Sequence, residues 1–195
     1  DGLADLLIGA QNGYVPGSRP LSGVSYVVFG RTSTATINLS SLASSSGGFV
    51  IGGYDLGYGA TYLMGGVSAG AGDVNGDGLA DILVGDASPN VVWVVFGKSN
   101  SNAVNLSNVT SGLGGFVINA ESSLPYAGPY SLASAGDVNG DGLADLIIGQ
   151  SKADPDSRQD AGRTYVVFGK TDTNSVNLAD VVNRNRDIAQ IALAK

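Results

Sequence analysis

The chain repeats one pattern three times, and an internal repeat limits the possible folds more than any other feature of a sequence. The first copy is DGLADLLIG at residues 1–9, and it returns as DGLADILVG at 77–85 and as DGLADLIIG at 141–149. Each copy is followed by YVVFG or WVVFG, at 26–30, 93–97 and 165–169. The DGLAD segments begin 76 and 64 residues apart, a period too long for leucine-rich or hexapeptide repeats.

Two weaker signals recur in the same order after each VVFG. A hydrophobic-Asn-Leu triplet lies at 37–39, 104–106 and 176–178, and an apolar cluster follows it at 49–51, 116–118 and 188–190. The pattern of apolar and turn residues predicts β-strands at 66–72, 81–85, 91–96 and 115–119, while another strand at 48–52 closes the first copy. Four short strands per period are typical of a propeller blade.

The Gly-rich strand is expected to lie innermost. Residues 66–72 and 131–136 are nearly all small, which suits a strand crowded around a central axis, whereas the bulky VVF strands belong further out. We therefore expect an all-β fold, a β-propeller of four-stranded antiparallel blades, with about three blades present. The tail at 179–195 departs from the pattern, so a helix and a degenerate outer strand are both open for it.

Composition excludes several kinds of chemistry. The chain has no cysteine and no histidine, which rules out disulfide frameworks, Cys/His zinc sites, thiol catalysis and Ser-His-Asp triads. Its formal net charge of −7 disfavours nucleic acid and anionic membrane surfaces as partners. No apolar run reaches the roughly 18 residues that a spanning helix needs, so we expect no membrane insertion. A cation is the natural partner to consider.

The loop between the first two strands of the later copies has the spacing of a metal-binding loop. DVNGDGLAD places side-chain oxygens at positions one, three, five and nine. Hard oxygens at this spacing favour Ca²⁺, which takes six to eight of them, over Mg²⁺, which prefers its own water in a strict octahedron. We expect a positive φ at Gly78 and Gly142, where each loop folds back. The predicted ligands are Asp73, Asn75, Asp77, Asp81 and the carbonyl of Leu79, and then Asp137, Asn139, Asp141, Asp145 and the carbonyl of Leu143.

A third, partial loop opens the chain, with Asp1, Leu3 and Asp5 at the matching positions. The three loops hold eight of the 17 acidic residues, and these carboxylates repel one another unless a cation binds. An EF-hand is the main competing interpretation, but its twelfth position is a Glu and its flanks are helices, whereas Val84 or Ile148 and strands stand here. A solvated turn explains one such cluster, but not identical offsets in two complete copies and a partial third.

These motifs resemble a known family. AGDVNGDGLADLIIG followed by YVVFGK is similar to the FG-GAP repeats of the integrin α-subunit propeller and, more closely, to those of large bacterial secreted and surface proteins. The resemblance covers residues 1 to about 180. It implies a propeller, usually of seven blades, with Ca²⁺ in the loop that joins the first two strands of certain blades. The GAP element itself is replaced by GAQ, GDA and GQS, so integrin ligand recognition is not inferred.

The repeats divide the chain into three expected units, at 1–76, 77–140 and 141–195. Propellers close with roughly four to eight blades, so three units do not make a ring. We expect the chain to be a fragment of a six- or seven-bladed ring, whose remaining blades come from the same longer chain or from a second copy.

The blade end opposite the metal loops is the candidate ligand-binding face. Its loops are long, at 10–24, 52–65, 120–130 and 150–163, and they hold residue types that are enriched at recognition surfaces. The alternative, that the tyrosines pack these loops onto the blades, remains open. The candidate ligand-binding residues are Tyr14, Arg19, Tyr54, Tyr58, Tyr62, Tyr126, Tyr130 and Arg158.

Three functions follow from these patterns. The first is a calcium-binding, secreted or cell-surface propeller module, expected in a bacterium, that recognises a protein or glycan or supports adhesion without catalysis. The second is part of a secreted hydrolase or lyase, either catalytic or accessory. Against a catalytic carboxylate pair, Glu121 is the only Glu, and Asp154, Asp156 and Asp160 form the only acidic cluster outside the loops. The third is a purely structural spacer.

Overall fold

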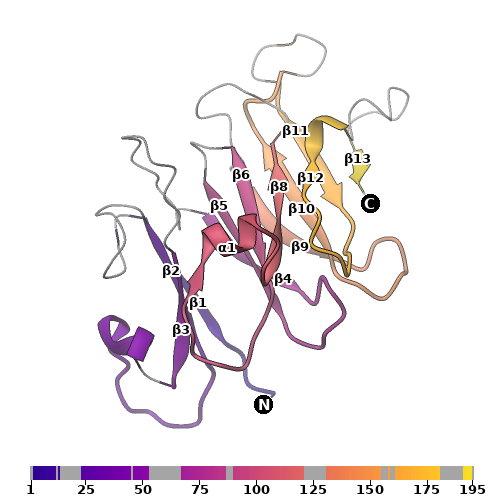
Figure 1. Ribbon diagram of the computed structural model, residues 1–195. Helices are drawn as coiled ribbons and strands as arrows, with labels where there is room; N and C mark the ends of the chain where they lie inside the picture. Colours follow the sequence, from indigo (N-terminus) through magenta and orange to yellow (C-terminus); the bar gives the residue numbers. More distant parts are fainter. Residues whose placement is uncertain are drawn as a thin grey trace.

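The computed structural model describes residues 2–11, 13, 23–44, 46–52, 67–86, 90–120, 131–154, 158, 161–180 and 191–194. These residues form three sheets, which lie side by side in chain order (Figure 1). The first sheet contains β1 (Leu6–Ala10), β2 (Val24–Val28), β3 (Gly48–Gly52) and β7 (Val104–Asn105). The second contains β4 (Val67–Gly72), β5 (Asp81–Asp86), β6 (Val91–Val95), β8 (Gly115–Asn119) and β12 (Val176–Asn177). The third contains β9 (Ser131–Gly136), β10 (Asp145–Gln150), β11 (Arg163–Val167) and β13 (Ile191–Ala194).

Helical structure among the described residues is limited to short segments. The 3₁₀ helix η1 spans Leu39–Ser44 and α1 spans Leu106–Thr110, and residues 178–180 are helical as well. None of the described helices is long and apolar enough to cross a membrane. The expected all-β fold is confirmed.

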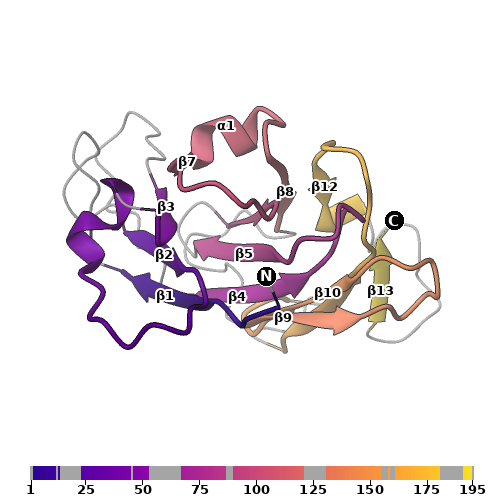
Figure 2. The ribbon, with the colours of Figure 1, turned by 90° about the horizontal axis from the view of Figure 1, so that it is seen from below.

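The three repeats fold into the same antiparallel core. The strand at the end of each DGLAD segment pairs with the VVFG strand, and the register is the same in all three repeats, since Leu6, Ile82 and Leu146 lie opposite the last Val of each VVF. The strands expected around 48–52, 66–72, 81–85, 91–96 and 115–119 all form within a residue or two. The small-residue strands β4 and β9 lie next to each other at one edge, away from α1 (Figure 2).

The outer edges of the sheets differ from the expected all-antiparallel blades. β13 pairs with β11 in parallel, so the antiparallel description is wrong for the last strand of the third sheet. Both alternatives for the tail are found in its described residues, since 179–180 are helical and Ile191–Ala194 form β13, while the apolar cluster at 188–190 lies outside the described residues. β7 and β12 were not predicted, because two-residue strands carry no measurable periodicity.

The hydrophobic-Asn-Leu triplets connect neighbouring sheets. The Val and Asn of the second triplet form β7, which pairs in parallel with β3 of the sheet before it, and β12 joins β8 in the same way. Asn105 then accepts a hydrogen bond from Ser107 N (2.9 Å) and caps α1. Leu106 and Leu178 are both buried in the cores between sheets. The second and third triplets therefore each fasten their repeat to the preceding one.

The two larger parts of the core lie between sheets, and a third packs Leu42 of η1 against β2 and β3 of the first sheet. On β5, Ile82 and Val84 pack toward the first sheet, whereas Leu83 packs toward the third. Trp93 is fully buried in the first of these clusters, where its Nε1 donates to Thr110 Oγ1 (3.0 Å). The expectation that Trp93 is a core residue is confirmed. Because both faces of the middle sheet are covered, its strands are continuous apolar runs.

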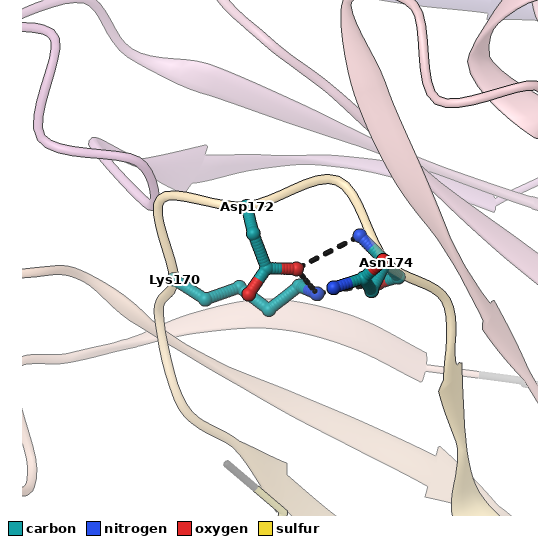
Figure 3. A network of polar contacts seen from close by, with 3 residues as sticks. All are labelled: Lys170, Asp172 and Asn174. Atoms are coloured by element: carbon teal, nitrogen blue, oxygen red, sulfur yellow. Dashed lines mark hydrogen bonds and ion pairs between the residues drawn. The ribbon is translucent and has the colours of Figure 1, made fainter.

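A lysine that follows each later FG pair bridges two sheets. The Lys98 ammonium lies 4.7 Å from the ring centroid of Phe49 on the first sheet, and Lys170 lies 4.7 Å from that of Phe116 on the second. Figure 3 shows how the Lys170 side chain is held, with its Nζ donating to Asp172 Oδ1 (2.7 Å) and to the Asn174 carbonyl. Cation–π contacts of this kind contribute about 0.5–1 kcal/mol at exposed sites.

The glycine of each FG pair is required because the DGLAD segment passes directly over it. A Cβ on Gly97 would lie 2.4 Å from Ala80 O, and one on Gly30 would lie 2.6 Å from Ala4 O. On Gly169 it would lie 2.6 Å from Leu143 Cβ. No L side chain fits at these distances without moving the backbone.

We predict that Gly97→Ala lowers the free energy of unfolding by about 1–3 kcal/mol, the usual cost of forcing extra atoms into a packed site. The matched control is Gly70→Ala, since no atom lies within 4 Å of the Cβ position on Gly70. Chemical denaturation measures both variants. Equal stabilities for the two variants would contradict this account of the FG glycine.

Candidate metal centre

Two equivalent loops connect the first two strands of the second and third sheets. Residues 73–80 join β4 to β5, and residues 137–144 join β9 to β10, so both loops lie at the same end of their sheets (Figure 1). Asp81 and Asp145 are buried where the second strand begins. Asp73 is half-buried, whereas Asp137 is exposed. The two loops therefore share a position but differ in their contact with water.

The first loop folds around the carboxylate of Asp73. Asp73 Oδ1 accepts hydrogen bonds from Gly76 N (2.7 Å) and Asp77 N (3.1 Å), while Oδ2 accepts one from Gly78 N (2.8 Å). Asn75 Oδ1 accepts from Asp77 N (2.8 Å). Asn75 Nδ2 also donates to Asp77 Oδ2 (2.9 Å), so these side chains point to the same side of the loop. The side chains thus determine the course of the backbone.

The second loop repeats this network bond for bond. Asp137 accepts from Gly140 N (2.7 Å), Asp141 N (3.1 Å) and Gly142 N (2.9 Å). Asn139 Oδ1 accepts from Asp141 N (2.8 Å), and Asn139 Nδ2 donates to Asp141 Oδ2 (2.9 Å). Identical hydrogen bonds in two loops show that DVNGDG encodes this conformation locally.

The glycines allow the loop to turn. Gly78 and Gly142 have φ values of +85° and +89°, which confirms the expected positive φ at the sixth position. Gly76 and Gly140 are also left-handed, at +80° and +77°. Side chains other than Gly, Asn and Asp rarely adopt this region.

The aspartate at the ninth position joins two distant parts of each repeat. Asp81 Oδ1 accepts from Gly97 N (2.7 Å) and its Oδ2 from Val74 N (2.7 Å). Asp145 makes the same two bonds, to Gly169 N (2.9 Å) and Val138 N (2.7 Å). We call this pair of hydrogen bonds the aspartate clamp. The sequence predicted Asp81 and Asp145 only as metal ligands. The clamp could have been predicted from the recurrence of DGLAD and FG together in every repeat.

The partial loop at the start of the chain keeps the FG bond of the clamp. Asp5 Oδ1 accepts a hydrogen bond from Gly30 N (2.7 Å). Leu3 is exposed, and Asp1 lies outside the described residues. The FG glycine therefore has the same partner in all three repeats.

Burial and neighbouring charges act together on Asp81. Desolvation, with a smaller contribution from the carboxylates of Asp77 and Asp73, raises the pKa of Asp81 to about 6, against the lowering effect of the hydrogen bonds that it accepts from Gly97 and Val74. Neither Lys nor Arg of the described chain pairs with any of these three carboxylates. Within the described chain, no cationic side chain compensates the negative charge of this loop.

The donor set fits a hard cation in its chemistry, with three carboxylates, one amide oxygen and a backbone carbonyl per loop. The geometry of the described residues is less complete, because no three acidic side chains come together closely enough to form a metal-binding group. The Asn75 amide nitrogen, rather than its oxygen, contacts Asp77. The loop is thus pre-folded by its own hydrogen bonds, with oxygen ligands of the right kind.

A comparison with protein families identifies this arrangement. The FG-GAP repeat model matches residues 128–167, which span β9, the second loop, β10 and β11. The chain carries an FG-GAP repeat. The two units before it share the register of this FG-GAP repeat and its bond from the FG glycine. No curated protein matches the chain as a relative.

The opposite end of the FG-GAP sheet contains a polar pocket. It has a volume of about 410 Å³ and lies where β10 ends and β11 begins, next to Gln150, Arg163 and Thr164. Arg158, one of the predicted ligand-binding residues, is exposed. The other seven lie outside the described residues: Tyr14, Arg19, Tyr54, Tyr58, Tyr62, Tyr126 and Tyr130.

The aspartate clamp predicts that Asp81→Ala is far more costly than Asp77→Ala, even in chelator. Removing the buried Asp81 carboxylate leaves two backbone N–H groups without acceptors and lowers the free energy of unfolding by about 2–4 kcal/mol. The exposed Asp77 supports only the loop, so its loss costs less than about 1 kcal/mol. Denaturation in EDTA measures both. A larger loss for Asp77→Ala would refute the clamp.

The raised pKa of Asp81 predicts a specific pH dependence in the absence of metal. A carboxyl whose folded pKa exceeds its unfolded value stabilises the fold most when protonated, and this contribution is lost as the pH rises from about 4 through about 6. The stability of the wild type relative to Asp81→Asn should therefore fall over this window in EDTA. A relative stability that rises instead would show that the clamp bonds outweigh desolvation.

Proposed function

We propose that this chain is a calcium-binding β-propeller module that acts outside the cell, recognising a protein or a glycan without catalysis. One observation carries the proposal. Two loops of identical sequence adopt the same hydrogen-bonded conformation at equivalent ends of neighbouring sheets. Structural turns do not need three carboxylates each, and mutual repulsion makes such a set costly without a cation.

Calcium is the proposed ion because every available donor is a hard oxygen, and Ca²⁺ accepts six to eight oxygen ligands in irregular geometry. When bound, the ion would neutralise carboxylates that no lysine or arginine of the described chain pairs with in the first loop. Extracellular calcium modules bind with Kd values of about 10⁻⁴–10⁻³ M, which suits a calcium-rich environment. The proposed ligands are Asp73, Asn75, Asp77, Asp81 and the Leu79 carbonyl, then Asp137, Asn139, Asp141, Asp145 and the Leu143 carbonyl, with Asp1, Leu3 and Asp5 for the partial loop.

The propeller assignment is supported by the lateral arrangement of the sheets. The middle sheet buries its two faces against its two neighbours, and the small-residue strands β4 and β9 are adjacent at one edge. In this proposal the units at 1–76, 77–140 and 141–195 are blades. A closed ring needs roughly four to eight blades, so further blades of a longer chain or a second copy would complete it.

The proposed recognition face is the end opposite the metal loops. Its support is the polar pocket beside Arg163 and the exposed Arg158 on the same end of the third sheet. Loops at one end of a rigid scaffold commonly carry binding residues. The six tyrosines and Arg19 named for this face are part of the proposal.

Calcium should raise the melting temperature of the chelated protein, and about 5 mM Ca²⁺ should add about 1–2 kcal/mol per site. Asp77→Ala and Asp141→Ala should each lower the calcium stoichiometry by one ion in calorimetric titration. Each substitution removes a ligand that is exposed in its loop and leaves the clamp in place.

Asp154→Ala is the matched control, because it removes an exposed acidic residue outside both loops. It should leave the stoichiometry unchanged. The proposal fails if Mg²⁺ stabilises the protein as much as Ca²⁺ does, or if both loop variants keep the full number of ions.

A further inference from the structure

An apolar groove of about 280 Å³ separates the inner parts of the first and second sheets. Leu7, Phe29 and Phe49 line it from the first sheet, and Ile82, Gly97 and Lys98 from the second. The remainder of the same boundary is closed by the Lys98–Phe49 contact and by β7 on β3. The groove therefore continues an interface that is otherwise packed.

The equivalent place between the second and third sheets is filled by Val74. This side chain is 0 % exposed and belongs to the core between those sheets. Val74 O accepts a hydrogen bond from Lys170 N (2.9 Å), and Asp73 O accepts one from Ala144 N (2.8 Å). The Val of Asp-Val-Asn thus closes a boundary between sheets, with one backbone hydrogen bond to its own carbonyl and one to the carbonyl of the preceding Asp.

At the groove the matching donors are present without acceptors. Ala80 N and Lys98 N occupy the positions of Ala144 N and Lys170 N, and neither makes a hydrogen bond within the described chain. Among the described strands β1 also has an open edge, because β5 and β10 are each covered by a small-residue strand whereas β1 pairs there only with β2. Leu6 and Ile8 on β1 are accordingly 63 % and 36 % exposed.

We propose that this groove binds an extended peptide segment of small residues followed by Asp-Val-Asn. The small residues add an antiparallel strand to the open edge of β1, and the Val side chain fills the groove. The carbonyls of the Asp and the Val accept hydrogen bonds from Ala80 N and Lys98 N. The inference depends on the observed boundary between the second and third sheets and does not depend on calcium.

Close packing at the second boundary explains why the segment must be small. Gly72, which directly precedes Asp73, has φ +77°, and a Cβ there would lie 2.7 Å from the Ala144 side chain. Both β4 and β9 end in Ala-Gly before Asp-Val-Asn. On the groove side, Gly70 of β4 has open space around its Cβ position, so an incoming strand has room there. An Ala-Gly-Asp-Val-Asn segment has small residues where the packing is close and a Val side chain to fill the groove.

The test uses the synthetic peptide SLASAGDVNG, which has the sequence of residues 131–140. It is titrated into the full chain in EDTA, so that a failure of calcium binding does not affect the result. We expect the peptide to raise the melting temperature and to slow amide exchange at Ala80 and Lys98 several-fold. The control peptide SLASAGDDNG places a carboxylate in the apolar groove and should produce neither effect.

A second variant blocks the groove from the protein side. Gly70→Leu places a bulky side chain in the open space of β4 and should abolish peptide binding, whereas Gly70→Ala should reduce it less. Equal binding of the two peptides, or no protection at Lys98, would overturn the proposal even if Gly70→Leu fails to fold. If the protein self-associates and the peptide does not dissociate the oligomer, the groove belongs to a second copy of the chain, and the proposal is overturned as well.

Discussion

The hydrogen bond from the FG glycine to the buried aspartate is the interaction on which each repeat depends. Asp81 is 1 % exposed, and it connects the start of β5 with Gly97, two residues after the end of β6, by accepting a hydrogen bond from Gly97 N. The glycine must be a glycine because the backbone of the DGLAD segment passes where its Cβ would be. DGLAD and FG recur together because the last Asp of DGLAD accepts the hydrogen bond from the FG glycine, and the glycine leaves space for the backbone of DGLAD. Burying a carboxylate is favourable only when its hydrogen bonds are made.

The same short signature also joins one sheet to the next. The residue after FG places its ammonium over a Phe of the preceding sheet, and at the second boundary its N–H binds the Val74 carbonyl. The hydrophobic-Asn-Leu triplet adds a two-residue strand and one buried leucine. Contacts of this kind reach only the nearest neighbour, as in other repeat proteins. The stability of the chain is therefore carried by its boundaries as much as by its sheets.

Features that depend on a few adjacent residues could be predicted from the sequence. The central strands, the positive φ of Gly78 and the burial of Trp93 follow from local apolar runs and turn chemistry. The parallel pairing of β13, the role of β7 and the second function of Asp81 depend on partners far along the chain. For the loops, spacing predicted the oxygen-rich conformation, because the Asp73 side chain bonds its own backbone. The described residues contain no point at which three carboxylates meet, because the side chain of Asp73 is directed at its own backbone N–H groups and that of Asp81 at Gly97 and Val74.

The aspartate clamp and a bound cation are compatible, because a carboxylate oxygen has two lone pairs and each oxygen of Asp81 accepts one described hydrogen bond. The two loops are nevertheless not equivalent electrostatically. Asp73 is half-buried because the third sheet covers its loop through Ala144, whereas Asp137 is exposed. Attraction between opposite charges strengthens as water is excluded. The desolvation cost of the carboxylates, which raises the pKa of Asp81, also increases. A cation that relieves this cost benefits the covered loop more than the open one. Packing of a neighbouring sheet would thereby tune the affinity of each loop, although the two sequences are the same.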